Sequence, residues 1–290
     1  MLRTDTQRNY GRRIEKVVAH LGERLDQPLT LEALAAVGHF SPYHFHRIYR
    51  GMMGETVADT LRRMRLHRAA VELIHGARTL AAIARLCGYG STAAFNRAFA
   101  QTYGCPPGEF RRRRGADAIL APRPTLDTNE DLTMYSVDIT QREPVVVAAL
   151  RHRGAYHEIG TAFERLGAWA GGRGLAENRS FGVYYDDPES KAPGELKSDA
   201  CIEIPDALAL ESDGPQRLTI AGGRYAVLIH TGPYAELERP YRWLYGEWLP
   251  NSGEEAADAP VVEEYLNDPR ALPPSQWRTA ICVPLREDRA

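Results

Sequence analysis

Apolar residues recur at helical spacing through the first third of the chain. Residues 10–25 place Ile14 and Leu21 on one face, which predicts a helix. Residues 30–49 then have the pattern of a short helix, a tight turn and a second helix, and residues 79–99 repeat it after a slip of one position. The repeat predicts two helix-turn-helix units, and the second helix of such a unit can lie in a DNA major groove.

Capping residues support this interpretation of both copies. Thr30 is placed to cap the first helix of the first unit, and Ser41 its second helix, with Pro42 at the first helical position. Ser91 stands at the corresponding cap of the second unit. Residues 57–75 predict a long basic helix that joins the two units.

Beyond residue 131 the pattern changes to short apolar runs typical of strands. A second echo appears here, because His152–Glu158 returns as His230–Glu236 at an offset of 78, each copy preceded by a strand-like run and followed by a helical stretch. The predicted strands are residues 133–139, 145–150, 181–186, 198–204, 216–221, 225–229, 260–266 and 277–284. We therefore expect an all-α N-terminal domain and an α+β C-terminal domain with a pseudo-twofold repeat and a curved antiparallel sheet.

Charge divides the chain at the same place. Residues 1–116 hold 19 Lys and Arg against 9 Asp and Glu, whereas residues 117–290 hold 17 against 29. A basic half joined to an acidic half predicts a polyanion binder fused to a module with another task. Residues 115–131 are rich in turn formers, so we expect domains at 1–114 and 132–286 with a linker between them.

The remaining composition narrows the class of protein. The four cysteines are scattered and the N-terminus lacks the apolar run of a signal peptide, so we expect a cytoplasmic, nucleoid-associated protein with reduced thiols. His152 and His230 have no His or Cys partner at metal-binding spacing. We expect no metal and no cofactor.

Residues 7–114 resemble the AraC/XylS family of transcription regulators, on the doubled helix-turn-helix and on the ending at residues 99–111. The resemblance implies seven helices and two recognition helices that enter adjacent major grooves of promoter DNA. With the outward positions of both helices, it gives these DNA-binding candidates: Tyr43, His46, Arg47, Arg50, Thr92, Ala93, Asn96 and Arg97. Arginine pairs with guanine and asparagine with adenine, so base contact is expected above all at Arg47 and Arg97.

Residues 132–286 resemble the GyrI-like small-molecule-binding domain. The resemblance rests on the two H-x-G-x-Y segments and on residues 182–188, 263–269 and 277–285, and the order of the two domains resembles the Rob-type regulators. It implies that Glu263 faces a cleft for a small lipophilic, cationic effector, with Tyr265 on the same strand face. The residues alone leave open whether Glu263 or Glu264 points inward. Aromatic candidates for the cleft wall are Tyr156, Trp169, Tyr184, Tyr185, Tyr234 and Trp243.

The sequence thus favours a ligand-responsive transcription regulator that is not an enzyme. One alternative is a hydrolase of small strained electrophiles, in which Glu263 acts as base beside Tyr184 or Tyr185. Another is a C-terminal domain that binds a protein such as RNA polymerase or a gyrase-like partner. No nucleophile triad, phosphate loop or metal cluster in the sequence supports the hydrolase independently, whereas the acidic charge of the C-terminal half fits the protein-binding alternative.

Overall fold

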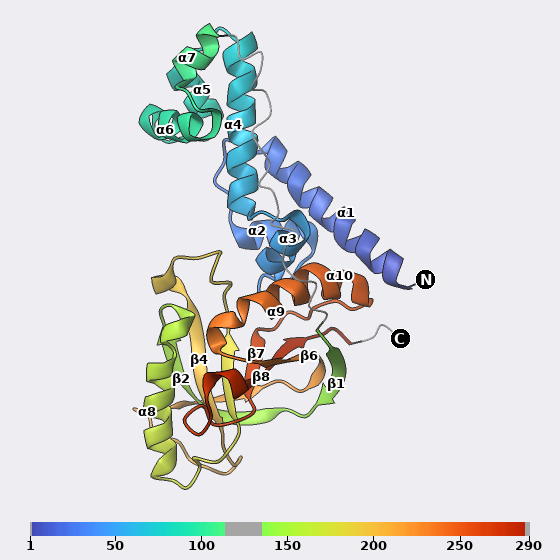
Figure 1. The fold of residues 1–290 in the computed structure, drawn as a ribbon, viewed down its shortest axis with the longest axis vertical. Coiled ribbons are helices and arrows are strands. Elements are labelled where there is room, and N and C mark those ends of the chain that lie inside the picture. Colours follow the sequence, from blue (N-terminus) through green and yellow to red (C-terminus); the bar gives the residue numbers. More distant parts are fainter. Residues whose placement is uncertain (1, 114–134, 288–290) are drawn as a thin grey trace. The chain divides into compact units, whose positions relative to one another are not determined.

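The computed structural model describes residues 2–113 and 135–287 and shows two compact units (Figure 1). One unit consists of residues 8–40 and 52–113. The other consists of residues 41–51 and 135–287, with the residues up to Gln7. The predicted linker 115–131 lies outside the described residues, so its boundaries stay a prediction.

The first unit is entirely helical, as predicted. Its helices, the first of which begins in the other unit, are α1 (Leu2–Glu23), α2 (Leu31–Gly38), α4 (Val57–His75), α5 (Leu80–Leu86), α6 (Thr92–Tyr103) and α7 (Pro107–Arg112). The predicted caps are present, because Thr30 Oγ1 accepts from Ala33 N at 3.2 Å and Ser91 Oγ accepts from Ala94 N at 3.1 Å. α1 begins eight residues before the predicted helix.

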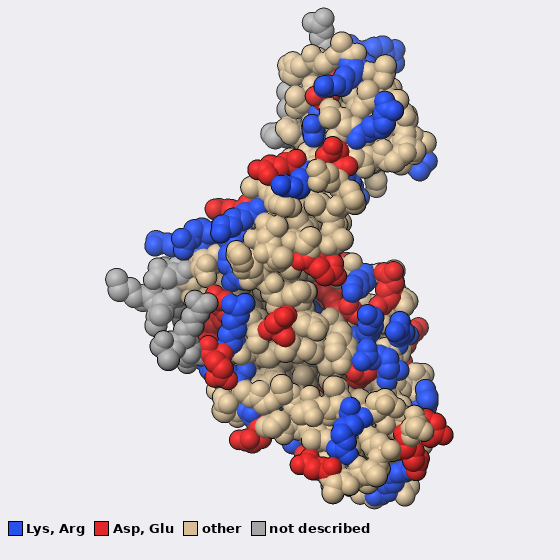
Figure 2. Space-filling model, turned by 180° about the vertical axis from the view of Figure 1, so that it is seen from behind, with Lys and Arg blue, Asp and Glu red and all other residues tan. Residues whose placement is uncertain are grey.

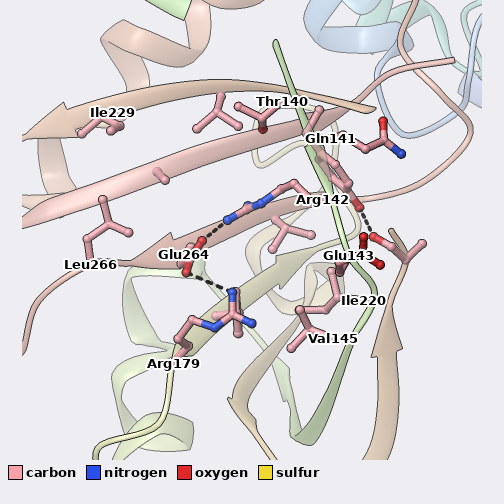
Figure 3. A pocket seen from close by; sticks show the side chains of 16 residues that line it. Thr140, Gln141, Arg142, Glu143, Val145, Arg179, Ile220, Ile229, Glu264 and Leu266 are labelled. Atoms are coloured by element: carbon pink, nitrogen blue, oxygen red, sulfur yellow. Dashed lines mark hydrogen bonds and ion pairs between the residues drawn. The ribbon is translucent and has the colours of Figure 1, made fainter. Parts of the chain in front are cut away.

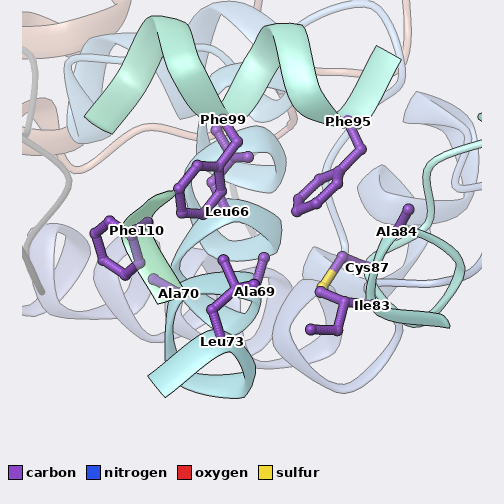
Figure 4. Packing of buried hydrophobic residues seen from close by; sticks show 10 residues of the cluster. All are labelled: Leu66, Ala69, Ala70, Leu73, Ile83, Ala84, Cys87, Phe95, Phe99 and Phe110. Carbon is purple, nitrogen blue, oxygen red and sulfur yellow. The ribbon is translucent and has the colours of Figure 1, made fainter. Parts of the chain in front are cut away.

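The core of residues 57–113 lies between α4 and the helices that follow it. Phe95 and Phe99 of α6 and Phe110 of α7 pack against small and aliphatic residues of α4 and α5 (Figure 4). The rings of Phe99 and Phe110 meet edge to face, with centroids 5.1 Å apart. Alanines on α4 let the aromatic rings approach its backbone closely, so α6 is held by one face and leaves the other free.

Helix α3 (Phe45–Met53) belongs mainly to the compact unit that contains residues 135–287, and it starts later than predicted. The sequence suggested a helix capped directly by Ser41 with Pro42 at its first position. Instead, Ser41 Oγ accepts from Tyr43 N at 3.3 Å, and a turn over residues 42–44 precedes the regular helix. Ser41 therefore caps the turn and not the first turn of α3. Its Oγ also donates to Asp258 at 2.9 Å.

An eight-stranded antiparallel sheet forms the body of the second unit, and the predicted strands are confirmed within a few residues at their ends. The strands are β1 (Val137–Arg142), β2 (Val145–Arg153), β3 (Ser180–Tyr184), β4 (Lys197–Glu203), β5 (Gln216–Ile220), β6 (Gly223–Thr231), β7 (Val261–Tyr265) and β8 (Arg278–Pro284). Their order is β1-β6-β8-β7-β3-β4-β2-β5. This order is symmetric about the β7–β3 pair, which is the pseudo-twofold arrangement predicted from the second echo.

Each echo forms the same turn from a strand into a helix. Gly154 and Gly232 have φ values of +143° and +145°, a backbone region that glycine adopts readily. The first turn leads through a 3₁₀ turn (Tyr156–Glu158) into α8 (Gly160–Gly171), which packs on β2 and β4. The second leads to α9 (Glu238–Trp243), a π-helical segment (Leu244–Trp248) and α10 (Leu249–Ser252). The two helical segments follow equivalent strands of the two halves of the sheet.

Candidate functional site

Glu263 lies at the centre of the sheet, on the strand pair that relates its two halves. It stands opposite Gly182 in the β3–β7 register. A Cβ atom at position 182 would lie 2.6 Å from the ring of Tyr184 and 2.8 Å from the hydroxyl of Tyr265. The missing side chain of Gly182 therefore makes room for two tyrosines beside Glu263.

Tyrosine hydroxyls surround the carboxylate. Tyr241 donates to Oε1 at 2.9 Å and Tyr265 donates to Oε2 at 3.2 Å, while the hydroxyls of Tyr184 and Tyr265 are 2.7 Å apart. The side chain is buried, with Glu263 only 5% exposed. Burial raises the pKa of Glu263, and the hydrogen bonds from Tyr241 and Tyr265 oppose that rise. The more distant charge of Arg47 also opposes the rise, so the site holds a buried carboxylate that, among the described residues, has hydrogen bonds but no ion pair.

Two more of the predicted aromatic residues lie next to this cluster. The ring of Tyr156 is 4.8 Å from that of Tyr184, and the ring of Tyr234 is 5.5 Å from that of Tyr265. Phe163 of α8 meets Tyr265 edge to face at 5.3 Å. The two echoed tyrosines, Tyr156 and Tyr234, therefore flank the glutamate from the two halves of the domain.

Three other predicted wall residues are not brought to Glu263. Tyr185 follows Tyr184 in the chain and its hydroxyl donates to Asp199 at 2.7 Å on the other side of the sheet. Trp169 packs at the edge of the core under α8, where Arg173 lies over its ring. Trp243 packs on Tyr135 with ring centroids 5.4 Å apart. Trp169 and Trp243 lie on helices, and the helix face on which each stands determines which residues it contacts. The presence of an aromatic residue in the sequence does not reveal that face.

Tyr241 is the residue of this cluster that sequence reasoning missed. The sequence showed it only as one of the aromatics of the helix after the second echo. Its spacing to Tyr245 is the available signal, because residues four apart share a helix face, and the two rings lie parallel at 6.4 Å.

The opposite face of the sheet carries a cavity of about 530 Å³ that the sequence did not predict (Figure 3). Glu264 points into it and pairs with Arg142, while a nitrogen of Arg179 lies 3.7 Å from the same carboxylate. Phe181 and Val262 supply part of its apolar lining. Adjacent glutamates thus serve opposite faces, and only Glu264 has an ion pair.

Helix α6 presents its predicted DNA-binding side chains as a recognition helix requires. Ala93 and Arg97 are exposed, and Thr92 and Asn96 are half-buried beside them. Residues 77–113 contain six arginines and one acidic residue, Glu109, and Figure 2 shows Lys and Arg side chains with few Asp and Glu over α5–α7. This surface suits a DNA backbone.

Helix α3 presents its candidates differently. Tyr43 is half-buried, and His46 is only 5% exposed, with Nδ1 at 2.7 Å from a carboxylate oxygen of Asp187. Arg47 donates to the backbone oxygen of Asp186 at 3.0 Å, and Arg50 pairs with Glu189. His46, Arg47 and Arg50 are thus engaged with the loop that follows β3.

Over residues 2–113 and 135–287, the structure shows no group of three or more His, Cys, Asp and Glu side chains arranged to hold a metal ion. Within the same ranges, no helix combines the length and apolar character of a membrane span.

Comparison with known proteins finds relatives of both the N-terminal helical region and the C-terminal domain. Residues 135–286 match the model of the GyrI-like small molecule binding domain, and residues 34–113 match that of a helix-turn-helix domain. The probable transcriptional regulator YgiV of Escherichia coli (strain K12) is 28% identical over 152 residues, which cover 51% of this chain and 95% of that protein. A DNA gyrase inhibitor of Edwardsiella piscicida is 34% identical over 144 residues, 48% of this chain and 90% of its own. The transcriptional activator RclR of Escherichia coli (strain K12) is 33% identical over 101 residues, covering 35% of this chain and 36% of that protein.

Proposed function

The chain belongs to the family of GyrI-like small molecule binding domains and also carries an AraC-type helix-turn-helix domain, and from this we propose that it is a transcription regulator controlled by a small lipophilic cation bound beside Glu263. That it is a DNA-binding regulator with a small-molecule-binding domain follows from the matches to family models and relatives. The nature of the effector and its site are the proposal.

The absence of an ion pair at Glu263 among the described residues carries this proposal, since the charge of Arg47 acts on the carboxylate only from beyond ion-pair distance. A buried carboxylate is costly unless it is paired, protonated or well hydrogen-bonded. No lysine or arginine among the described residues forms an ion pair with Glu263, whereas the neighbouring Glu264 pairs with Arg142. A ligand that brings one positive charge would complete the site.

The aromatic rings around Glu263 fit the same class of ligand. Tyr184, Tyr234 and Tyr265 offer ring faces and edges near the carboxylate, and a cation over such a ring gains roughly 0.5–2 kcal/mol. A lipophilic cation would use both the rings and the charge. A neutral apolar compound would use only the rings, and an anion would meet repulsion.

Ligand binding is tested by the thermal unfolding of the full-length protein with tetraphenylphosphonium, a neutral apolar compound of similar size and a fatty acid. At 100 times its dissociation constant the cation should add about 2.7 kcal/mol to the free energy of unfolding. We expect Glu263→Gln to lose this gain and Glu264→Gln, the matched control on the opposite face, to keep it. A gain that survives Glu263→Gln would remove the assigned site.

For DNA we propose that α6 and α3 read adjacent major grooves, as the resemblance to AraC/XylS regulators implies. The exposed Arg97 and the arginine-rich surface of α5–α7 support this for α6. On a DNA fragment selected by the protein from a random pool, Arg97→Ala should cost roughly 1–3 kcal/mol and relax base preference. An equal loss on every sequence would make Arg97 a phosphate contact, and binding no tighter than to random DNA would overturn the regulator itself.

A second candidate function is the binding of another protein by residues 135–286. The observation that favours it is the relative named as a DNA gyrase inhibitor, which aligns with this part of the chain. Thermal shifts absent with every class of compound, together with a stable complex with gyrase in a binding assay, would favour this function. Hydrolysis of a strained electrophile that is lost in Glu263→Gln would instead add an enzymatic role.

A further inference from the structure

The first recognition helix is packed into the effector-binding domain. Residues 41–51 form one compact unit with residues 135–287. At the C-terminal end of this segment, Gly51 meets Gly246 so closely that a Cβ on Gly51 would lie 2.4 Å from the Cα atom of Gly246. Two backbones can approach this closely only where neither residue has a Cβ atom, and glycine at both positions meets that condition.

Polar contacts fix the register of this packing. His44 Nδ1 lies 2.8 Å from the hydroxyl of Tyr245, and their rings are stacked with centroids 5.6 Å apart. His44 is 0% exposed, and burial lowers its pKa to about 3, so it is held as a neutral ring. At the start of the segment, Ser41 donates to Asp258.

The loop after β3 supplies acidic partners for the candidate DNA-binding side chains. We call residues 186–189 the acidic loop, since it contains Asp186, Asp187 and Glu189. It binds His46, Arg47 and Arg50 through two carboxylates and one backbone oxygen. Oxygen acceptors of this kind are also what a DNA backbone offers to the same side chains.

Occupation by the acidic loop excludes DNA. Asp187 and His46 are 8% and 5% exposed, so their contact is closed to solvent and to any other partner. Although burial alone would raise the pKa of Asp187, the hydrogen bond from His46 and the charge of Arg47 lower it, so Asp187 keeps its negative charge. A recognition helix must present these side chains to base edges.

Arg47 connects this contact to the candidate ligand site. Its guanidinium carbon lies 5.2 Å from the ring centre of Tyr241, whose hydroxyl donates to Glu263 at 2.9 Å. A cation at Glu263 would bring a second positive charge toward Arg47. Like charges repel strongly where water is excluded, so such a ligand would weaken the hold on Arg47.

Tyr156 provides a second connection between the two sites. Its hydroxyl donates to the backbone oxygen of Asp186 at 2.8 Å and accepts from the Asp186 N–H at 2.9 Å. Its ring meets Tyr184 of the glutamate cluster. Displacement of Tyr184 by a ligand would therefore act on the backbone that holds Arg47.

We propose that the acidic loop and DNA compete for the first recognition helix, and that a cation bound at Glu263 shifts the competition toward DNA. This inference rests on the proposed function, because it assigns a regulatory mechanism to the same ligand site and the same DNA-binding helix. The apparent affinity for DNA then equals the intrinsic affinity multiplied by the fraction of molecules whose helix is free.

The test compares two full-length double variants that remove the same charge. Asp187→Asn with Glu189→Gln disrupts the acidic loop. Glu211→Gln with Asp268→Asn is the matched control, since these carboxylates pair with Arg173 and Arg270 at exposed positions of the same domain. If the helix is held in ten molecules of eleven, the loop variant should bind the selected DNA fragment about tenfold more tightly than the control.

Tetraphenylphosphonium supplies the second arm. It should tighten DNA binding of the unsubstituted protein and of the control, and add little to the loop variant. Equal affinity of the two double variants, or weaker binding by the loop variant, would overturn the competition. An undiminished response of the loop variant to the probe would overturn the coupling.

A measurement without DNA tests the contact independently. Amide hydrogens of residues 44–50 should exchange faster in the loop variant than in the control, and equal exchange would overturn the inference. Failure of the proposed function has a different signature, because binding would then show no preference for the selected fragment and no dependence on Arg97.

Discussion

At the scale of single residues, the neighbouring glutamates Glu263 and Glu264 show how environment assigns a role. Both are buried, yet one accepts hydrogen bonds from tyrosines and the other pairs with Arg142. The side chains alternate across the sheet, so the same chemical group meets two different surroundings. Of the two, Glu263 is the one with no ion pair among the described residues, so it is the one that a cationic ligand could pair with.

The raised pKa of Glu263 predicts how stability depends on pH. Because the folded protein holds this proton more tightly than the unfolded chain, the contribution of Glu263 is lost as the pH rises from about 4.5 through the folded-state pKa. Glu263→Gln should remove that part of the fall. Denaturant unfolding of both proteins from pH 4 to 8 measures it, and parallel curves would contradict the prediction.

The same group predicts how ligand binding depends on pH. A cation binds the ionised carboxylate, so its affinity should rise with pH through the folded-state pKa of Glu263. Calorimetric titration with tetraphenylphosphonium across this range checks the sign. An affinity independent of pH would show that the cation binds elsewhere or that Glu263 stays ionised throughout.

At the scale of elements, the helix-turn-helix echo includes the caps as well as the apolar face. Thr79 Oγ1 accepts from Ala82 N at 3.2 Å, as Thr30 Oγ1 does from Ala33 N. The start of α5 therefore repeats the start of α2. Ser41 departs from the pattern, since its hydroxyl accepts from Tyr43 N, two residues along the chain and not three, and also donates to Asp258.

Removing either helix cap of the second helix-turn-helix, at the start of α5 or of α6, should lower the free energy of unfolding by a small and similar amount. Thr79→Ala and Ser91→Ala should each lower the free energy of unfolding by about 1 kcal/mol, since each leaves a helix N–H without its acceptor. Thr102→Ala, in the last turn of α6, should cost little because alanine has a higher helix propensity than threonine. Chemical denaturation followed by circular dichroism measures all three, and a cap variant as stable as Thr102→Ala would contradict the prediction.

At the scale of the whole molecule, the net charge of −2 conceals opposite halves. The excess of Lys and Arg in residues 1–116 lies in the helix-turn-helix region, and the excess of Asp and Glu in residues 117–290 lies mainly in the GyrI-like domain. Binding to DNA should therefore depend on local rather than net charge.

This predicts a salt dependence that belongs to the N-terminal half. Arg112, exposed at the end of α7, should contribute one phosphate contact, so Arg112→Ala should reduce the slope of log K against log salt by about 1 without changing base preference. Arg173→Ala in the GyrI-like domain should leave the slope unchanged. DNA-binding titrations at several salt concentrations measure the slope for the unsubstituted protein, Arg112→Ala and Arg173→Ala. Equal slopes for all three would exclude a phosphate contact by Arg112.

Most of the elements, and the symmetry that relates them, could be predicted from residue patterns along the chain. Apolar spacing located the eight strands and most of the helices, although α1 starts earlier and α3 later than predicted, and the echoes at residues 30–99 and 152–236 predicted the repeated helix-turn-helix and the pseudo-twofold sheet. These features follow from local propensity and periodicity, which act over a few residues and can be read along the chain.

The contacts between distant side chains follow from the folded packing and could not be predicted in this way. This packing turned Glu263 toward the tyrosines, brought Tyr241 to them, took Tyr185 and Trp243 elsewhere, and joined residues 41–51 to the acidic loop. Periodicity fixes the face of an element that a residue occupies. The partner of that face, often more than a hundred residues away, is fixed by packing, which periodicity along one chain does not record.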